Sequence, residues 1–261
     1  MSAVFKTGIE PRLDETGLQR DFLRFEFKYI LDLALRDKIE SSIVNFMRPD
    51  PIVASKPDQK YVVRSLYFDD PYYSSYYDKI DGLIHRAKFR LRTYTNNPAE
   101  DCSTYLEIKG RQGQMVFKKR VPMLPETDQF IRQADGDITQ KIIDYAEPGY
   151  VRDRFRFDYL RKSIKPVMVI DYQRRPYHTR YSQDFRLTFD DSLYGLYADS
   201  LHGNDSKKRS LLRGYTVMEI KFRAHIPAWF HSIIKSYQLQ RVSVSKVCAG
   251  INAWNLVPRL D

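Results

Sequence analysis

Cationic side chains recur at every second position in several short segments of the chain, with apolar side chains between them. In Lys88-Phe89-Arg90-Leu91-Arg92, three cations alternate with two apolar residues. Successive side chains of a β-strand point to opposite faces, so this alternation predicts strands with one charged and one apolar face. The predicted charged faces carry eleven cations and four acids, namely Arg24, Lys28, Lys88, Arg90, Arg92, Lys109, Lys118, Arg120, Arg174, Arg186 and Lys221 against Glu26, Glu107, Asp190 and Glu219.

Such an excess of one sign on a sheet surface indicates a bound ion of the other sign. The whole chain has 43 cations and 33 acids, so its ratio of cations to acids is much smaller. Like charges directly opposite each other destabilise neighbouring strands, and an ordinary solvated sheet face mixes both signs. Arginine forks hold phosphate oxygens in pairs, and lysines act as point charges. The pattern favours a linear chain of phosphates as the ligand, with an ordinary solvated face as the alternative.

The elements that carry these side chains follow from the same periodicities. Alternation predicts strands at 22–30, 61–69, 86–94, 103–109, 114–121, 166–174, 184–190 and 216–223. Helical spacing predicts helices at 32–47, with Asp32 as its N-cap, and at 71–80, 127–146, 150–161, 227–239 and 245–254. Residues 109–113 lie between two predicted strands and are interpreted as a hairpin loop.

We therefore expect an α+β fold in which eight antiparallel strands close into a barrel. Helices would cover the apolar outside, and the charged faces would turn inward around the ligand. An interior of this size would not admit duplex nucleic acid, so no nucleic-acid partner is expected. The chain also lacks the glycine-rich loops that hold phosphates in nucleotide-binding α/β folds.

Composition sets the broad class. The chain has 261 residues, a net charge of +10 and 43% hydrophobic residues, which suits one domain with its own core. Two cysteines, Cys102 and Cys248, give neither a disulfide framework nor a metal-ligand spacing. No apolar run approaches the roughly 18 residues of a membrane span, and the first residues lack the apolar core of a signal peptide. We expect a cytoplasmic protein without a membrane segment.

The order of several short motifs resembles a known family. Arg24-x-Glu26-x-Lys28 is similar to the first strand motif, Glu-x-Glu-x-Lys, of the triphosphate tunnel metalloenzyme, or CYTH-like, superfamily. More specifically, the chain resembles the VTC domain over about residues 20–255, and we expect a single domain of this type across 1–261. The motifs that carry the resemblance are Ser65-Leu66-Tyr67-Phe68-Asp69, Lys88-Phe89-Arg90-Leu91-Arg92, Leu106-Glu107-Ile108-Lys109, Lys118-Lys119-Arg120, Glu219-Ile220-Lys221-Phe222 and Ser245-Lys246.

The resemblance implies an activity. VTC polymerases transfer the γ-phosphoryl group of ATP to a growing inorganic polyphosphate chain and release ADP, with Mn²⁺ or Mg²⁺ as cofactor. It implies catalytic roles for Lys28, Arg90, Arg92, Lys109 and Glu219. Binding of ATP and polyphosphate would fall to Lys118, Lys119, Arg174, Arg186, Lys221 and Lys246, and the charged faces add Arg24, Lys88 and Arg120. Glu219 is the expected metal ligand, assisted by Glu26 and Glu107.

Three interpretations remain open at this point. Arg24 stands where hydrolytic relatives have glutamate, which favours a polymerase over a triphosphatase that splits tripolyphosphate or nucleotides. The third interpretation is a polyphosphate-binding module without turnover.

In the polymerase reaction the nucleophile would be an ionised phosphate, so no catalytic histidine is expected. The tyrosines of 72–77 are more typical of helix packing than of adenine stacking. Any coupling to a membrane requires a separate partner protein, and the oligomeric state does not follow from the sequence.

Overall fold

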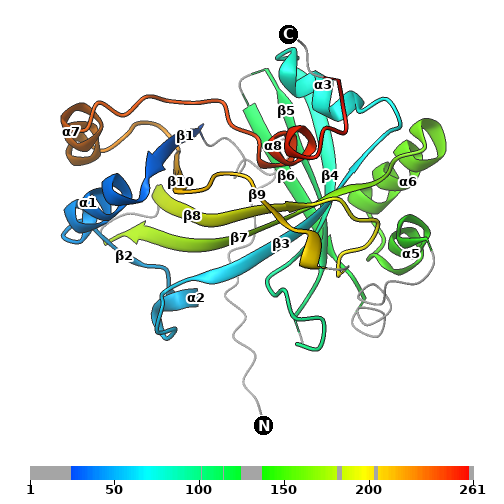
Figure 1. Cartoon of the computed structure of the whole chain (residues 1–261), viewed down its shortest axis with the longest axis horizontal. Helices are drawn as coiled ribbons and strands as arrows, with labels where there is room; N and C mark the ends of the chain where they lie inside the picture. Colours follow the sequence, from blue (N-terminus) through cyan, green and yellow to red (C-terminus); the bar gives the residue numbers. More distant parts are fainter. Residues whose placement is uncertain are drawn as a thin grey trace, which may run out of the picture.

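The computed structural model describes residues 25–100, 102–113, 115–124, 137–180, 184–202 and 205–258. All the strands in this part of the chain belong to one antiparallel sheet (Figure 1), in the order β1-β10-β8-β7-β3-β4-β5-β6. Two short strands extend it, with β2 paired to β7 and β9 to β8. The strands are β1 (Phe25–Asp32), β2 (Met47–Pro49), β3 (Tyr61–Asp69), β4 (His85–Thr93), β5 (Tyr105–Gln112), β6 (Met115–Pro122), β7 (Lys165–Thr179), β8 (Phe185–Leu196), β9 (Arg209–Ser210) and β10 (Tyr215–Phe222).

Helices cover the sheet in groups. Figure 1 shows α1 and α7 together at one end, α5 and α6 at the other, and α8 in front of the strands. The helices are α1 (Leu33–Ile43), α2 (Pro51–Ala54), α3 (Ser74–Ile80), α5 (Ile138–Tyr145), α6 (Tyr150–Lys162), α7 (Ala228–Ser236) and α8 (Lys246–Ala253), with a 3₁₀ turn η3 (Asp205–Lys207). Within the described ranges, no helix is long and apolar enough to cross a membrane.

All eight predicted strands are found, and six of the predicted helices have counterparts. Asp32 caps α1 as expected, accepting a hydrogen bond from the Leu35 amide at 2.7 Å. The helix expected at 127–146 is described only from Ile138 onward, and residues 127–136 lie outside the described part. The elements β2, α2 and β9 were not predicted, because they are too short to show a periodicity.

The hairpin expected at 109–113 is present, but its loop is shorter than predicted. Strand β5 continues through Gln112, and Lys109 pairs with Lys118 of β6. The turn is instead made around Gly113, whose φ of +61° is the conformation that glycine adopts most readily. Gly110 stays within the strand because the Phe117 ring of the neighbouring strand lies over it and fills the space of the missing side chain.

The barrel is not closed. β1 and β6 are the two ends of the strand order, and the described residues show no pairing between them, so the sheet is open and curled. Two contacts explain how it curls without closing. Lys109 Nζ of β5 lies 3.1 Å from both carboxylate oxygens of Glu26 of β1, so charged side chains span the gap. The Lys28 carbonyl on the β1 edge accepts a hydrogen bond from the Val242 amide at 2.8 Å, so part of this edge is already occupied.

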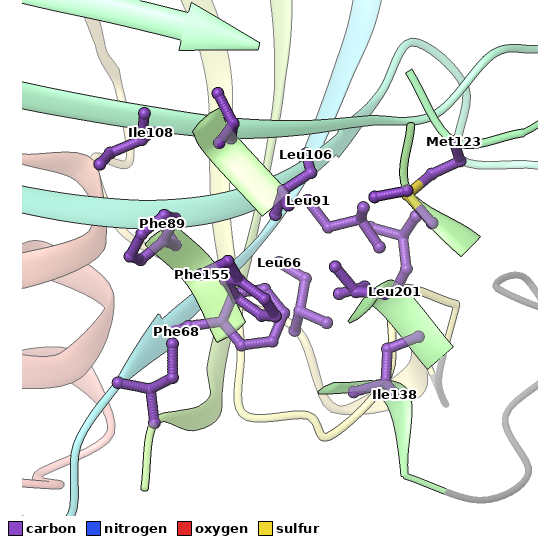
Figure 2. Packing of buried hydrophobic residues seen from close by; sticks show 14 of the residues in the cluster. Leu66, Phe68, Phe89, Leu91, Leu106, Ile108, Met123, Ile138, Phe155 and Leu201 are labelled. Atoms are coloured by element: carbon purple, nitrogen blue, oxygen red, sulfur yellow. The ribbon is translucent and has the colours of Figure 1, made fainter. Parts of the chain in front are cut away.

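The apolar faces form the outer core, as the alternation predicts. Phe155 of α6 packs edge-to-face between Phe68 and Phe89, with ring centroids 5.1 and 5.2 Å away (Figure 2). Leu91 and Leu106 are fully buried in the same cluster, which α5 completes. A second cluster joins β1, β8 and β10 to α1 and α7. This burial fixes the outer face, so the charged residues of opposite parity must point to the inner face.

Helix α8 is an exception, because it packs against the inner face. Its Gly250 lies against Met168 and Ile170 of β7, which share a parity with Tyr172 and Arg174. The helix therefore fills one part of the curled sheet and presents its first residue, Lys246, to the space that remains.

The contact between Gly110 and Phe117 gives a test of the corrected β5–β6 hairpin. A Cβ at position 110 would overlap the Phe117 ring, so Gly110→Ala is expected to destabilise the fold by about 1–3 kcal/mol, the usual cost of overpacking. Chemical denaturation measures this. Truncating the ring in Phe117→Ala should remove most of the penalty, and a double-mutant cycle without coupling between the two positions would contradict the packing described here.

Candidate active site

A cavity of about 1260 Å³ occupies the inner face of the curled sheet. Its walls come from seven of the strands, residues of α3 and α6, the first residue of α8 and residues 241–245, which we call the cover segment. Fifteen cations line it against two acids, Glu26 and Glu219. The cations are Lys28, Lys79, Arg86, Lys88, Arg90, Arg92, Lys109, Arg111, Lys118, Lys119, Arg120, Arg174, Lys221, Arg241 and Lys246.

Most of the residues predicted for the site therefore meet in one cavity. Of the predicted residues that the structure describes, two do not line it. Arg24 lies outside the described residues. Arg186 is on a predicted charged face but is exposed near the start of β8, beyond the cavity. Glu107 points inward, but it is completely buried beneath the cationic side chains.

Glu107 of β5 holds cations of the two neighbouring strands, β4 and β6, in place. Arg90 donates to it from Nε at 2.7 Å and lies at the same distance through Nη2, and Lys118 Nζ is 2.6 Å away. Burial alone would favour the neutral acid, but the charges of Arg90, Arg92 and Lys118 outweigh it and keep the Glu107 pKa well below its usual range. This placement favours a positioning role for Glu107 over the metal-binding role expected from the sequence.

Asp190 performs a similar task on the other side of the cavity. It accepts two hydrogen bonds from Arg174, at 2.7 and 2.8 Å, and lies 2.6 Å from Lys246 Nζ. Burial opposes the ionisation of Asp190, yet Arg174 and Lys246 lower its pKa. The buried aspartate thus links a strand arginine to the first residue of α8, and sequence analysis assigned it no such role.

Glu26 and Glu219 are the two carboxylates that face the cavity. They lie on adjacent strands, where Lys28 pairs with Glu219 and Glu26 with Lys221. Lys28 Nζ is 3.0 Å from Glu26 and 3.7 Å from Glu219. Burial and the neighbouring carboxylate both raise the Glu26 pKa, but Lys109, Lys28 and Lys221 outweigh them and lower it. Both groups are therefore held ionised side by side.

The pair Glu26 and Glu219 suits a divalent cation that is bound together with a phosphate-containing ligand. Among the described residues no cluster of three or more His, Cys, Asp or Glu side chains is found, so no preformed metal cage exists there. Mg²⁺ commonly binds through one or two carboxylates and completes its shell with phosphate oxygens and water. Glu26 and Glu219 offer such a partial shell beside cations that would hold the phosphates.

Two tyrosines on the inner face escaped sequence analysis. Tyr67 accepts a hydrogen bond from Arg90 Nη1 at 3.1 Å. Burial raises its pKa, but the charges of Arg90, Arg92 and Lys88 dominate and lower it to about 7. Tyr172 accepts a hydrogen bond from Arg92 at 3.3 Å. Their signal in the sequence was strand parity, since each shares a face with neighbouring charged residues.

The cover segment was missed altogether because it has no periodicity. It runs from the β1 edge toward α3 and β4 and leads into α8. Lys79 Nζ donates to Ser243 Oγ at 2.9 Å, and Lys88 Nζ donates to Ser245 Oγ at 3.2 Å. The cover segment thereby joins β1, α3 and β4 over one side of the cavity.

The tyrosines of 72–77 serve the packing of α3, as the sequence favoured. Tyr76 is buried and donates to Asn252 of α8 at 2.6 Å, while Tyr73 and Tyr77 pack against the same cluster. Tyr72 is 83% exposed. None of the four lines the cavity.

Comparison with known proteins places this geometry in a family. The model of the VTC domain family matches residues 23–255. The chain belongs to the VTC domain family. A cationic cavity on the inner face of a curled antiparallel sheet is thus the feature that this VTC domain builds from the motifs described above. No curated protein matches the chain in sequence.

Solved structures are similar to this VTC domain at low sequence identity. A candidate adenylate cyclase from Bacillus halodurans has a TM-score of 0.50 and 11% identity, covering 85% of this chain and 95% of its own. A protein from Pyrococcus horikoshii gives 0.45 and 13%, covering 88% and 99%. A candidate adenylyl cyclase from Hippeastrum, described as having a dominant triphosphatase activity, gives 0.46 and 10%, covering 88% and 95%.

The lowered lysine pKa values predict proton uptake on anion binding. Burial lowers the Lys109 pKa to about 8, since the charges of Lys28 and Lys221 offset the help from Glu26. At pH 8.5 a substantial fraction of Lys109 is neutral, and a bound polyanion favours its charged form. Calorimetry of tripolyphosphate binding in buffers of different ionisation enthalpy should show more proton uptake at pH 8.5 than at pH 7. Lys109→Arg, which is always protonated, should take up fewer protons at pH 8.5. Equal uptake by both proteins would contradict the assignment.

The roles of the three glutamates can be separated by Mn²⁺ binding. Glu219→Gln should weaken Mn²⁺ binding in the presence of tripolyphosphate roughly tenfold or more, because the affinity of such sites follows the charge of their ligands. Electron paramagnetic resonance of free Mn²⁺ measures this.

Glu107→Gln serves as the matched comparison. It should leave Mn²⁺ affinity nearly unchanged but cost about 3–5 kcal/mol of stability, as is usual when a buried ion pair loses one partner. An equal loss of Mn²⁺ affinity in both variants would make Glu107 a ligand.

Proposed function

We propose that this VTC domain transfers the γ-phosphoryl group of ATP to an inorganic polyphosphate chain and releases ADP. The observation that carries the proposal is the lining of the cavity, where fifteen cations face two carboxylates. Such a lining suits a ligand that spreads many negative charges along a line. Membership of the VTC domain family supports the same substrate class.

Positioning and charge neutralisation supply the mechanism. Arg90, Arg92 and Arg174 present guanidinium forks whose direction is fixed by Glu107, Tyr172 and Asp190. A divalent ion, when bound at Glu26 and Glu219, would neutralise charge on the phosphate oxygens. An oxygen of the terminal phosphate of the chain attacks the γ-phosphorus, and the bond to the β–γ bridging oxygen breaks. The attacking oxygen is already ionised, so no protein base is needed, and phosphoryl transfer requires little else from the enzyme.

Hydrolysis of a triphosphate is the second candidate. The observation that favours it is the pair Glu26 and Glu219, because two ionised carboxylates beside a phosphate site are also what a metal-activated water would need. The sequence argument against hydrolysis rested on Arg24, which lies outside the described residues. The third interpretation, a binding module without turnover, uses the same cations and requires no metal.

One incubation with ATP and Mn²⁺ distinguishes these functions. The expected result is a ladder of polyphosphate on a gel, with ADP equal to the phosphate incorporated. Orthophosphate without a ladder would replace the polymerase with a triphosphatase. Tight polyphosphate binding without turnover of ATP would leave a binding module.

Variants tie the activity to the cavity. Arg90→Glu would place a second acid beside the buried Glu107 and disturb folding, so Arg92→Ala and Lys88→Ala are better probes. Each removes one phosphate contact and should lower turnover about tenfold or more, since hydrogen bonds to charged groups contribute roughly 1.5–3 kcal/mol. Arg156→Glu, an exposed position on α6 outside the cavity, should retain full activity. Full activity in both cavity variants would exclude this cavity as the site.

A further inference from the structure

The two ends of the cavity differ in chemistry. Strand β4 runs along its length, and both Arg86 near the start of the strand and Tyr94 just after its end line the wall. A nine-residue strand spans roughly 30 Å, so these residues mark opposite ends. Arg86 pairs across the sheet with Arg111, and Lys79 lies nearby. At the other end, Tyr94 is accompanied by Tyr61.

The tyrosine end is held rigidly. The rings of Tyr61 and Tyr94 meet edge-to-face with centroids 5.8 Å apart. Tyr105 supports Tyr94 from behind at 6.4 Å, and the Arg120 guanidinium lies over the Tyr105 ring at 4.6 Å. Tyr61 and Tyr94 are half-buried and both line the cavity.

These two rings also differ from the other aromatic rings in the cavity wall. Cations already cover the faces of Phe27, Tyr67, Tyr150 and Tyr172, at 4.0 to 5.9 Å from the ring centroids, and Phe25 stacks on Phe222. For Tyr61 and Tyr94 the described residues provide no such cation. They are therefore the cavity rings suited to a flat, uncharged group.

The tyrosine end of the cavity adjoins two of the arginines that we propose bind phosphate. Tyr61 on β3 pairs directly with Arg174 on β7, so their side chains start about 5 Å apart. Arg92, two residues before Tyr94 on the same strand, has the same parity and donates to Tyr172. A molecule held by Arg92 and Arg174 through phosphates would place whatever is attached to those phosphates against Tyr61 and Tyr94.

We propose that Tyr61 and Tyr94 form the binding platform for the base of a nucleoside triphosphate, which sets the direction of the ligand in the cavity. The base stacks at the tyrosine end, and the triphosphate extends past Arg92 and Arg174 toward Lys88 and Lys109. The growing inorganic chain then occupies the opposite end, at Lys79, Arg86 and Arg111. This assignment rests on the proposed function, because it presumes that the cavity takes a nucleoside triphosphate.

Binding of two ligands to the whole chain tests the platform. ATP carries a base, whereas inorganic tripolyphosphate offers only the phosphates. Tyr61→Ala and Tyr94→Ala should each weaken ATP binding roughly tenfold, which is typical for the loss of one base–aromatic stack, and leave tripolyphosphate binding unchanged. Tyr61→Phe and Tyr94→Phe keep the ring and should restore ATP binding. Tyr72→Ala, an exposed tyrosine outside the cavity, is the matched control and should bind both ligands like the original chain.

The outcomes separate this proposal from the one on which it rests. Equal loss of both ligands, or no loss of either, in both alanine variants would overturn the platform while leaving a triphosphate site. An unaltered chain that binds neither ligand would overturn the proposed function itself.

A second measurement avoids variants that fail to fold. Photocrosslinking of 8-azido-ATP to the unaltered chain, mapped by mass spectrometry, should label residues 61–62 or 94–105. Labelling confined to residues 79–86 would place the base at the wrong end and overturn the assignment.

Discussion

The inner face depends on a balance between cations that repel each other and a few buried carboxylates that hold them. Lys88, Lys109 and Lys118 are direct neighbours across β4, β5 and β6, an arrangement that sheets normally avoid. The adjacent row places Glu107 between Arg90 and Arg120, so one buried acid stabilises the cations around it. Asp190 has the same function between Arg174 and Lys246. Without these two acids, the direction of the Arg90 and Arg174 guanidinium groups would not be fixed.

Sequence patterns predicted the faces of the sheet well because burial enforces parity. Phe89 and Leu91 had to point outward to reach α6, so Lys88, Arg90 and Arg92 had to point inward. Parity does not give position along a strand, which is why Arg186 was included although it lies beyond the cavity. Parity also does not tell whether an acid is at the surface or beneath it, so it could not separate the buried Glu107 from Glu26 and Glu219, which face the cavity. Whether the barrel closes depends on how far the sheet curls, and the alternation of apolar and charged residues does not indicate this.

The cover segment, which sequence analysis missed, lies where no regular element imposes a period. The cover segment binds the β1 edge through the Val242 backbone and the two lysines Lys79 and Lys88 through its serines. Contacts of this kind depend on which chain segments meet in space. The same limit applies to Tyr61 of β3, Tyr94 just after β4 and Tyr105 of β5, which become a group only when the sheet is assembled.

The gap between the first and last strands has a consequence for the dimensions of the interior. In a fully closed barrel the circumference is fixed by backbone hydrogen bonds at about 4.8 Å per strand. Here Lys109 and Glu26 span one part of the circumference through side chains alone. Rotation about their side-chain bonds can change the cross-section without breaking a hydrogen bond of any strand ladder. The width of the interior can therefore change at this junction while every pairing between strands stays intact.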